Sequence, residues 1–248
     1  MPSSSHRPRK RFGQHFLHDP RVLARIVDSI DPQKDDCIVE IGPGEGALTR
    51  PLLEKVGKLE AIELDRDLAA SLAAQFPPWR LTVHCADALE FDFARFPAGM
   101  RLAGNLPYNI STPLLFHLAQ YAERVRDMHF MLQLEVVERM VAAHSTPEYG
   151  RLSVALQVRF QMKKLFKVAR GAFRPPPKVE SALVRLVPLE HPLRVDEDLL
   201  RKAFSARRKT LKNALPGIDF AALGIDPRLR PENLSPQDYA RLSMNSIL

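Results

Sequence analysis

Between residues 37 and 134, short apolar runs alternate with segments whose apolar residues recur every three or four positions. Short apolar runs are typical of strands, and the three-to-four spacing is typical of helices. We therefore expect strands at 37–41, 58–64, 80–85, 100–105 and 128–134. A regular alternation of strands and helices predicts an α/β fold, with an open, mostly parallel sheet covered by helices on both faces.

The pattern continues on both sides of this region. Asp19 and Pro20 suit the start of a helix, whose apolar positions recur with helical spacing until Asp31-Pro32 ends it. Two more strand-like runs, at 165–170 and 181–189, bring the expected sheet to seven strands. The prolines of "RPPPK" at 174–178 form a stiff connector between these two runs.

After residue 192 the strand pattern stops, and 196–215 and 235–248 have the apolar spacing of helices. The first residues of the chain are polar, basic and rich in Pro and Ser, so we expect them to be partly mobile. The predicted organisation is a basic N-terminal segment (1–18), an α/β domain (19–192) and a small helical domain (193–248).

The charge is concentrated in one part of the chain. The net charge is +7 over 248 residues, but residues 31–100 hold 13 acids and 7 bases, whereas 150–212 hold 16 bases and 5 acids. The run "FQMKKLFKVARGAFRPPPK" at 160–178 has no acid and includes Phe166 and Phe173. Basic residues interleaved with aromatic ones favour a nucleic-acid partner over a merely solvated surface.

Several classes of protein are disfavoured. No apolar run approaches the roughly 20 residues of a membrane helix, and the N-terminus lacks the apolar core of a secretory signal. Cys37 and Cys85 lie in apolar runs, so we interpret both as buried thiols of a reducing compartment. The histidines have no metal-ligand spacing. We expect a cytoplasmic protein without a metal or membrane site.

A glycine-rich loop indicates a nucleotide-like cofactor. "VEIGPGEGALT" at 39–49 places Gly42, Gly44 and Gly46 between a strand and a helix, where glycines let the backbone approach a ligand. Glu63 follows about 20 residues later at the tip of the second strand, where an acid can hold ribose hydroxyls. Without the lysine of a phosphate-binding loop, an NTPase is disfavoured, whereas dinucleotide and S-adenosylmethionine folds both fit.

Asp87 lies just past the third strand, where it could accept a hydrogen bond from an adenine amino group. It could equally cap the next helix, so its role stays open from the residues alone. In the same way, Glu63 could cap the helix that begins near Asp65, although its combination with the glycine loop favours the ribose role.

The fourth predicted strand ends in "GNLPYN" (104–109), at the sheet edge where the glycine loop also lies. The amine of a nucleobase is a poor nucleophile and must be held in line with a sulfonium methyl group. The Asn105 side chain and the Leu106 carbonyl can accept its two hydrogens, and Pro107 fixes the direction of that carbonyl. Tyr108 offers a ring on which the base can stack. Such chemistry depends on positioning and electrostatics.

With these motifs in hand, the whole chain resembles the bacterial small-subunit (16S) rRNA adenine dimethyltransferases. The matching stretches keep the family's order, and they include "RKRFGQHFL" (9–17), "VEIGPGEGALT", "IELDRDL", "GNLPYNISTPLLFHL", "FRPPPKVESALVRL" (173–186) and "FSARRKTLKNAL" (204–215). The resemblance implies a Rossmann-like class I methyltransferase that takes methyl groups from S-adenosylmethionine. It implies as acceptors two adjacent adenosines in a hairpin loop near the 3′ end of 16S rRNA, in the immature small subunit.

The resemblance also implies roles for particular residues. Cofactor contacts would come from His15, Leu17, Gly42, Glu63, Asp87 and Asn105, although many members have Asn where this chain has His15. Phe173 would form a second aromatic wall opposite Tyr108, unless it is simply a core residue at a strand end. Phosphate contacts would come from Arg207, Arg208, Lys209 and Lys212, which the pattern places on one helix, unless they form only a solvated basic face.

Three alternatives remain at this stage. The macrolide-resistance methylases of 23S rRNA share the motifs, although "FSARRKT" and "NLPYN" favour the small-subunit group. A ribosome assembly factor whose binding matters more than its catalysis would need the same basic segments. A DNA adenine methyltransferase lacks support, because no target-recognition insert is visible. We expect a monomer whose main partner is 16S rRNA.

Overall fold

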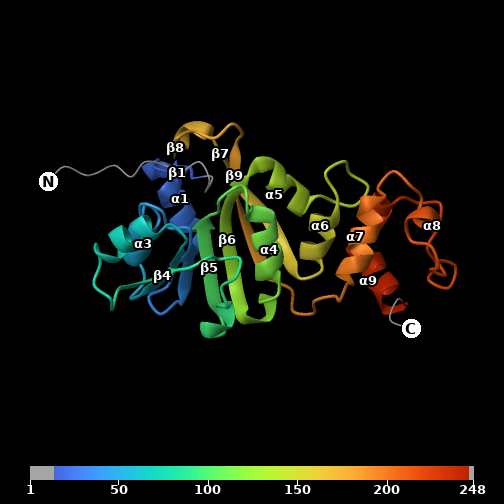
Figure 1. Ribbon diagram of the computed structural model, residues 1–248, viewed down its shortest axis with the longest axis horizontal. Helices are drawn as coiled ribbons and strands as arrows, with labels where there is room; N and C mark the ends of the chain where they lie inside the picture. Colours follow the sequence, from blue (N-terminus) through green and yellow to red (C-terminus); the bar gives the residue numbers. More distant parts are fainter. Residues whose placement is uncertain (1–13, 246–248) are drawn as a thin grey trace. The chain divides into compact units, whose positions relative to one another are not determined.

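The computed structural model describes residues 14–245, and its centre is a seven-stranded sheet (Figure 1). The strands follow the order β4-β3-β2-β5-β6-β9-β7, in which the pairs from β4 to β6 are parallel and β9 is antiparallel to β6. This confirms the predicted α/β fold. The strands are β2 (Ile38–Ile41), β3 (Leu59–Glu63), β4 (Leu81–Cys85), β5 (Met100–Asn105), β6 (Val125–Gln133), β7 (Phe160–Val168) and β9 (Ser181–Pro188).

The helices before β6 that connect these strands or lead into them are α1 (Pro20–Ile30), α2 (Thr49–Leu53), α3 (Arg66–Ala73) and α4 (Ser111–Ala119). The Asp19 carboxylate caps α1 as predicted, by accepting hydrogen bonds from the backbone N–H groups of Arg21 and Val22. The helical spacing of α1 buries Ile26, Val27 and Ile30. Short 3-10 turns at Phe93–Arg95 and Ala122–Arg124 complete the connections.

The two faces of the sheet use alternate residues of each strand. In β2, Ile38 belongs to the core cluster that includes residues of α1, α2 and α3, whereas Val39 and Ile41 point to the opposite face. Helix α4 lies over that opposite face (Figure 1). The central strands β2, β3, β5 and β6 are largely buried, and this is why their sequences read as nearly continuous apolar runs.

A small ribbon, which the sequence does not predict, lies beside α1. Its two strands are β1 (Phe16–Leu17) and β8 (Phe173–Arg174), which pair antiparallel with Phe16 opposite Arg174. A 3-10 turn at Arg170–Ala172 precedes β8. Since each strand is only two residues long, no alternation of polar and apolar positions marks it.

Gly104 fixes the spacing between β5 and β2. A Cβ atom at this position would lie 2.2 Å from the Ile41 carbonyl oxygen, so no larger residue fits without moving the strand. The close approach brings the end of β5 against the glycine loop that follows β2. Gly104 therefore determines where Asn105 is placed.

A buried ion cluster joins the amino ends of the parallel strands. Arg101 is 4% exposed and donates to both carboxylate oxygens of Asp127, at 2.8 Å each, and to Asp36 at 2.6 Å. Burial alone would raise the pKa of Asp36, but hydrogen bonds from the Gln33 backbone and Arg101 outweigh it and lower that pKa. The cluster lies at the opposite end of the strands from "GNLPYN".

By its internal contacts the described chain divides into two compact units. The first combines the chain up to Leu134 with Lys163–Val187, and the second combines Glu135–Met162 with the chain from Pro188. The helical part is predicted from the sequence to begin near residue 193, whereas in the structure Glu135–Met162 also belongs to the second unit. The second unit contains helices α5 (from Leu134 to Val141), α6 (Arg151–Gln157), α7 (Glu197–Ser205), α8 (Leu211–Ala214) and α9 (Pro236–Asn245), and a 3-10 turn at Pro231–Asn233.

Two sequence-based expectations are wrong in detail. Helix α7 ends at Ser205, so the cations 207–209 lie in a turn between α7 and α8 rather than on one helix. Cys85 is exposed at the end of β4 rather than buried. Within residues 14–245, no helix is long and apolar enough to cross a membrane.

Candidate active site

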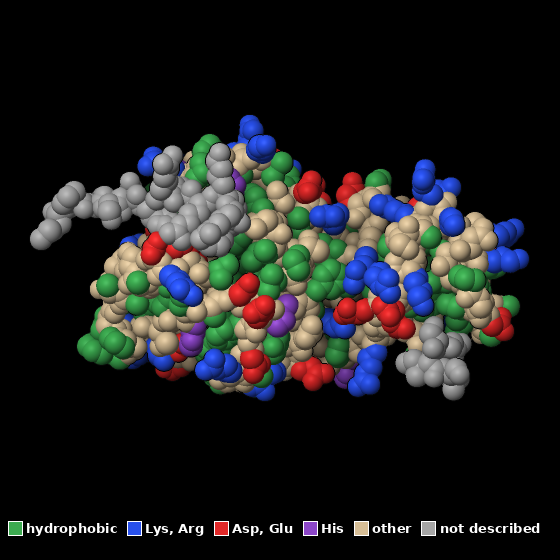
Figure 2. Space-filling model, viewed as in Figure 1, with side chains coloured by type: hydrophobic (Ala, Val, Ile, Leu, Met, Phe, Trp, Pro, Cys, Tyr) green, Lys and Arg blue, Asp and Glu red, His purple; other side chains and the backbone are tan. Residues whose placement is uncertain are grey.

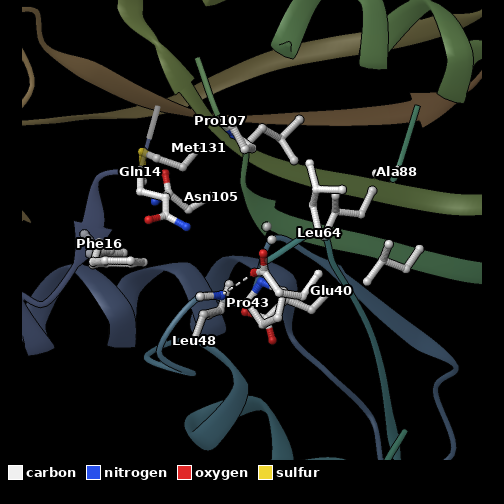
Figure 3. A pocket seen from close by; sticks show the side chains of 18 of the residues that line it. Gln14, Phe16, Glu40, Pro43, Leu48, Leu64, Ala88, Asn105, Pro107 and Met131 are labelled. Atoms are coloured by element: carbon white, nitrogen blue, oxygen red, sulfur yellow. Dashed lines mark hydrogen bonds between the residues drawn. The ribbon is translucent and has the colours of Figure 1, made fainter. Parts of the chain in front are cut away.

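A pocket opens at the carboxyl ends of the parallel strands, where the sequence analysis places the site (Figure 3). All of its lining residues belong to the first unit. Most of them come from β1 and the residues before it, from the glycine loop after β2, from the tips of β3 and β4, and from the segment after β5. Of the predicted site residues, the pocket brings together His15, Leu17, Gly42, Gly44, Glu63, Asp87, Asn105, Leu106, Pro107 and Tyr108.

Asn105 is the last residue of β5 and has one hydrogen-bonding atom unused. Its side-chain nitrogen donates to the His15 carbonyl oxygen at 2.7 Å, which fixes the orientation of the amide. Its Oδ1 atom is buried and has no hydrogen-bond partner in the described part of the chain. A buried acceptor without a donor costs free energy, so this atom suits a ligand that brings an N–H group.

The next two residues carry the chain out of the sheet. The Leu106 backbone N–H donates to the Met131 carbonyl at 3.1 Å, and the Leu106 side chain is 1% exposed, so its backbone is firmly anchored. Among residues 14–245, the Leu106 carbonyl oxygen accepts no hydrogen bond. Pro107 follows directly and restricts the backbone at Leu106. The site therefore holds two unused acceptors on consecutive residues.

Tyr108 is held at both of its ends. Its hydroxyl lies 2.5 Å from the Ser181 hydroxyl, and burial raises the pKa of Tyr108 above its ordinary value. Its ring centroid is 5.3 Å from that of His15, with 31° between the ring planes. The His15 Nδ1 atom in turn donates to the Pro175 carbonyl oxygen at 2.8 Å. Tyr108 thus presents a fixed aromatic ring beside the pocket.

The glycine loop and Glu63 hold each other in place. The Glu63 carboxylate accepts from the Gly44 N–H at 3.1 Å and from the Asp65 N–H at 2.9 Å, and burial raises its pKa. Gly44 has φ +56°, and a Cβ atom there would lie 2.9 Å from the Phe16 ring. Both facts require glycine at this position. Glu63 thus braces the loop while it also lines the pocket.

Asp87 occupies the turn after β4. Its carboxylate accepts from the Leu89 N–H at 2.9 Å, and the residue lines the pocket and is partly exposed. One carboxylate oxygen can serve the turn while the other faces a ligand. The geometry is compatible with both roles that the sequence leaves open, and the adenine contact stays a prediction.

Glu40 is a pocket residue that the sequence analysis does not identify (Figure 3). It is 1% exposed, and it accepts a hydrogen bond of 2.6 Å from the Thr49 hydroxyl. Burial, and less strongly the nearby Glu63 carboxylate, raise the pKa of Glu40 to about 7. The sequence does contain one signal that could have identified Glu40: it is the only acid in the apolar strand "IVEI", where a buried strand would otherwise hold an apolar residue.

Phe173 does not line the pocket. It pairs with Leu17 in the small ribbon, is 2% exposed and belongs to the core cluster around α1. In this arrangement Phe173 is a core residue, which is the alternative to the aromatic-wall role that the sequence leaves open. A role as second aromatic wall stays a prediction, and it requires the segment around β8 to move.

The predicted RNA-binding cations belong to the second unit, whereas all pocket residues belong to the first. Arg207 donates to the Pro147 carbonyl oxygen at 2.6 Å and lies 3.7 Å from the Glu232 carboxylate, so it stabilises the turn. Arg208, Lys209 and Lys212 are exposed. Their phosphate contacts stay a prediction. Within residues 14–245, no group of acidic, His and Cys side chains could hold a metal ion.

Comparison with protein families relates this site to known proteins. The model of the family described as ribosomal RNA adenine dimethylase matches residues 5–244. The ribosomal RNA small subunit methyltransferase A of Aromatoleum aromaticum is 57% identical over 97% of this chain and 94% of its own length. The protein of the same name from Thiobacillus denitrificans is also 57% identical, over 96% of this chain and 97% of its own.

Solved structures are similar along nearly the whole chain. A dimethyladenosine transferase from Plasmodium falciparum superposes with a TM-score of 0.80 at 27% identity, covering 93% of this chain and 97% of its own. The 23S rRNA methyltransferase ErmE superposes with a TM-score of 0.71 at 25% identity, covering 94% of this chain and all of its own. Both similarities therefore extend over nearly the whole fold of this chain.

Proposed function

The chain belongs to the ribosomal RNA adenine dimethylase family, and we propose that the residues around Asn105 hold the target adenine while the glycine loop holds the methyl donor. The enzyme is an S-adenosylmethionine-dependent methyltransferase that acts on adenine in ribosomal RNA. The observation that carries the residue assignment is the Oδ1 atom of Asn105 at the carboxyl end of β5, which is buried and has no hydrogen-bond partner among the described residues.

The pocket fits an adenosine-containing cofactor. Glu63 is buried at a strand tip where a carboxylate can accept from ribose hydroxyls, and Asp87 follows the next strand at the same edge. The backbone of the glycine loop reaches the pocket at Gly42 and Gly44, which both line it. When bound, S-adenosylmethionine supplies a methyl group that is already activated by its sulfonium. No metal or strong base is then required of the chain.

Catalysis by this chain consists mainly of positioning. Asn105 Oδ1 and the Leu106 carbonyl are two unused acceptors, which matches the two hydrogens of an adenine amino group. Holding both hydrogens directs the nitrogen lone pair toward the methyl donor and stabilises the positive charge that develops on the amine. Tyr108 supports the base through its ring, which the Ser181 hydroxyl fixes.

We assign the small-subunit (16S) rRNA as substrate, with two adjacent adenosines near its 3′ end as acceptors during subunit biogenesis. The relatives named for the small subunit are 52–57% identical to this chain, whereas the 23S rRNA methyltransferase ErmE is 25% identical. This difference supports the small subunit over the macrolide-resistance alternative. An immature subunit as the direct partner, a monomeric enzyme and a cytoplasmic location remain predictions that accord with this substrate.

The test measures methyl transfer from labelled S-adenosylmethionine to separated small and large subunits from cells lacking the enzyme. The wild-type protein should label small-subunit RNA alone. Asn105→Ala should lower the rate about 100- to 1,000-fold, the range for removal of one polar group that stabilises developing charge. Asn105→Asp keeps an acceptor at this position, so its rate of methyl transfer should lie between those of the wild-type protein and Asn105→Ala. Label in large-subunit RNA would overturn the substrate assignment.

A primarily non-catalytic role in subunit assembly is the second candidate, and the basic segments of both units favour it as much as they favour catalysis. Subunit profiles of cells carrying Asn105→Ala separate the two. If cells lacking the protein have defective profiles that Asn105→Ala restores without methylation, the assembly role is supported. If Asn105→Ala leaves the profiles as defective as the deletion does, methylation is the activity that counts.

A further inference from the structure

Five exposed cations line one side of the first unit, next to the small ribbon. We call them the β7–β8 basic face; they are Arg25, Lys167, Arg170, Arg174 and Lys178. Figure 2 shows Lys and Arg side chains along the upper edge of the view, where Figure 1 places β7 and β8. Four of the five come from the acid-free run at 160–178.

Packing brings these residues together from separate parts of the chain. The Arg25 guanidinium lies 3.9 Å from the centroid of the Phe166 ring, which joins α1 to β7. Val168, Ala172 and Phe173 belong to the same core cluster as Ile26 and Val27 of α1. The buried side of each segment therefore faces α1, and the cations are left on the outside.

The charges on this face are not neutralised within the protein. None of the five side chains forms an ion pair with another residue among those that the structure describes. Elsewhere in the same unit, Lys58 pairs with Glu60 at 2.7 Å, and Arg126 pairs with Asp36 at 3.0 Å. The nearest acids in sequence, Asp28 on α1 and Glu180 after the proline run, are exposed and only partly offset the face.

The face borders the mouth of the pocket. Arg174 pairs with Phe16, which lines the pocket, and the Pro175 carbonyl accepts a hydrogen bond from His15, which also lines it. A base that enters this pocket must leave its stack, and its own phosphates then lie within a nucleotide or two of the rim. Cations beside the rim are therefore placed to contact the backbone that flanks the target.

We propose that the β7–β8 basic face binds the RNA phosphates that flank the target adenosines, as a second contact surface within the unit that holds the pocket. The inference rests on the proposed function, because it takes the RNA to enter that pocket. The contact with the Phe166 ring holds the Arg25 guanidinium against β7, on the same side as the other cations of the face. Phosphate contacts of this kind position the substrate without reading its sequence.

The test compares two triple variants of the full-length protein. Lys167→Gln/Arg170→Gln/Arg174→Gln neutralises the face, and Lys34→Gln/Lys55→Gln/Arg95→Gln neutralises three exposed cations near the amino ends of the strands. Binding to unmethylated small subunits is measured from 50 to 200 mM salt. The face variant should reduce the slope of log K against log salt by about 2 to 3, with about 100-fold weaker binding near 0.1 M salt.

The control triple should shift this slope by less than about 0.5, and both variants should bind S-adenosylmethionine as the wild type does. Equal slopes for the two triples would overturn the proposed face. The same mixtures report methyl transfer by the wild-type protein, so a failure of the proposed function is seen separately as absent transfer to small-subunit RNA. Lys178→Gln, a single exposed change, should alone reduce the slope by about 0.7 to 0.9.

Discussion

At the scale of single residues, the account depends on Tyr108 acting through its ring. Tyr108→Ala should lower methyl transfer by about 100-fold or more while leaving the affinity for S-adenosylmethionine within a few-fold, because the proposed role of the ring is to stack on the base and not to hold the donor. Tyr108→Phe keeps the ring and loses only the hydroxyl contact to Ser181, so it should retain most activity. Methyl-transfer rates and calorimetric affinities for S-adenosylmethionine measure the two effects separately. An equal loss of activity and of affinity in Tyr108→Ala would contradict the stacking role.

Glu40 gives a second prediction at this scale. Its pKa is raised to about 7 from the ordinary 4.5, so the folded state binds its proton more tightly than the unfolded state. The stabilisation that this provides is fully present below about pH 4.5 and is lost as pH rises through 7, a change of about 3 kcal/mol. Glu40→Gln should remove this part of the pH dependence.

Denaturant unfolding between pH 4.5 and 8 measures this effect. The variant should become progressively more stable than the wild type as pH rises, whereas Glu54→Gln, an exposed control, should follow the wild-type curve. If the free energies of unfolding of Glu40→Gln and the wild type changed in parallel with pH, ionisation of Glu40 would not destabilise the folded state, and the raised pKa would be refuted. The Thr49 hydroxyl can donate to the Gln carbonyl as it does to Glu40, so the local contact is retained.

At the scale of elements, the junction of β2 and β5 positions the site. Gly104→Ala should lower the free energy of unfolding by about 3 kcal/mol or more, because its Cβ atom would overlap the Ile41 carbonyl and neither strand can move freely. Gly171→Ala, where a Cβ atom meets nothing within 4 Å, is the matched control and should change stability by less than about 1 kcal/mol. Similar stability of the two variants would refute a close approach.

Elements also show where sequence reasoning works and where it does not. The apolar runs predict all seven strands of the sheet, most directly β2, β3, β5, β6 and β9, which are largely buried. The edge strand β7 is partly exposed and begins at Phe160, earlier than predicted. The ribbon of β1 and β8 escapes prediction because two residues carry no periodicity. The break after Ser205 escapes because "SARRKT" contains no Gly or Pro, and the turn is held by the contacts of Arg207 with Pro147 and Glu232.

The site divides in the same way. Residues with a backbone or motif signal, such as Gly42 and Asn105, are predicted and line the pocket together. Phe173 has a motif signal, yet its partner in the structure is the core, which only tertiary packing reveals. Glu40 lacks a motif signal of its own, and its importance depends on burial and on Thr49, neither of which a single sequence shows.

At the scale of the whole molecule, cofactor binding should be visible in global stability. A ligand that binds only the folded state stabilises it by about 2.7 kcal/mol at 100 times its Kd. For a chain of this size that is a rise in Tm of about 5 to 10 °C. S-adenosylmethionine should produce this shift, and NAD at the same concentration should not. A shift with NAD alone would contradict the identity of the cofactor.

The most direct test of the central claim is the position of the product. Unmethylated small subunits are incubated with the wild-type protein and S-adenosylmethionine, and the modified nucleotides are mapped by primer extension and mass spectrometry. The account predicts dimethyladenosine at two adjacent positions of the hairpin loop near the 3′ end of 16S rRNA, and its loss with Asn105→Ala. Modification at any other nucleotide, or full modification by Asn105→Ala, would contradict it.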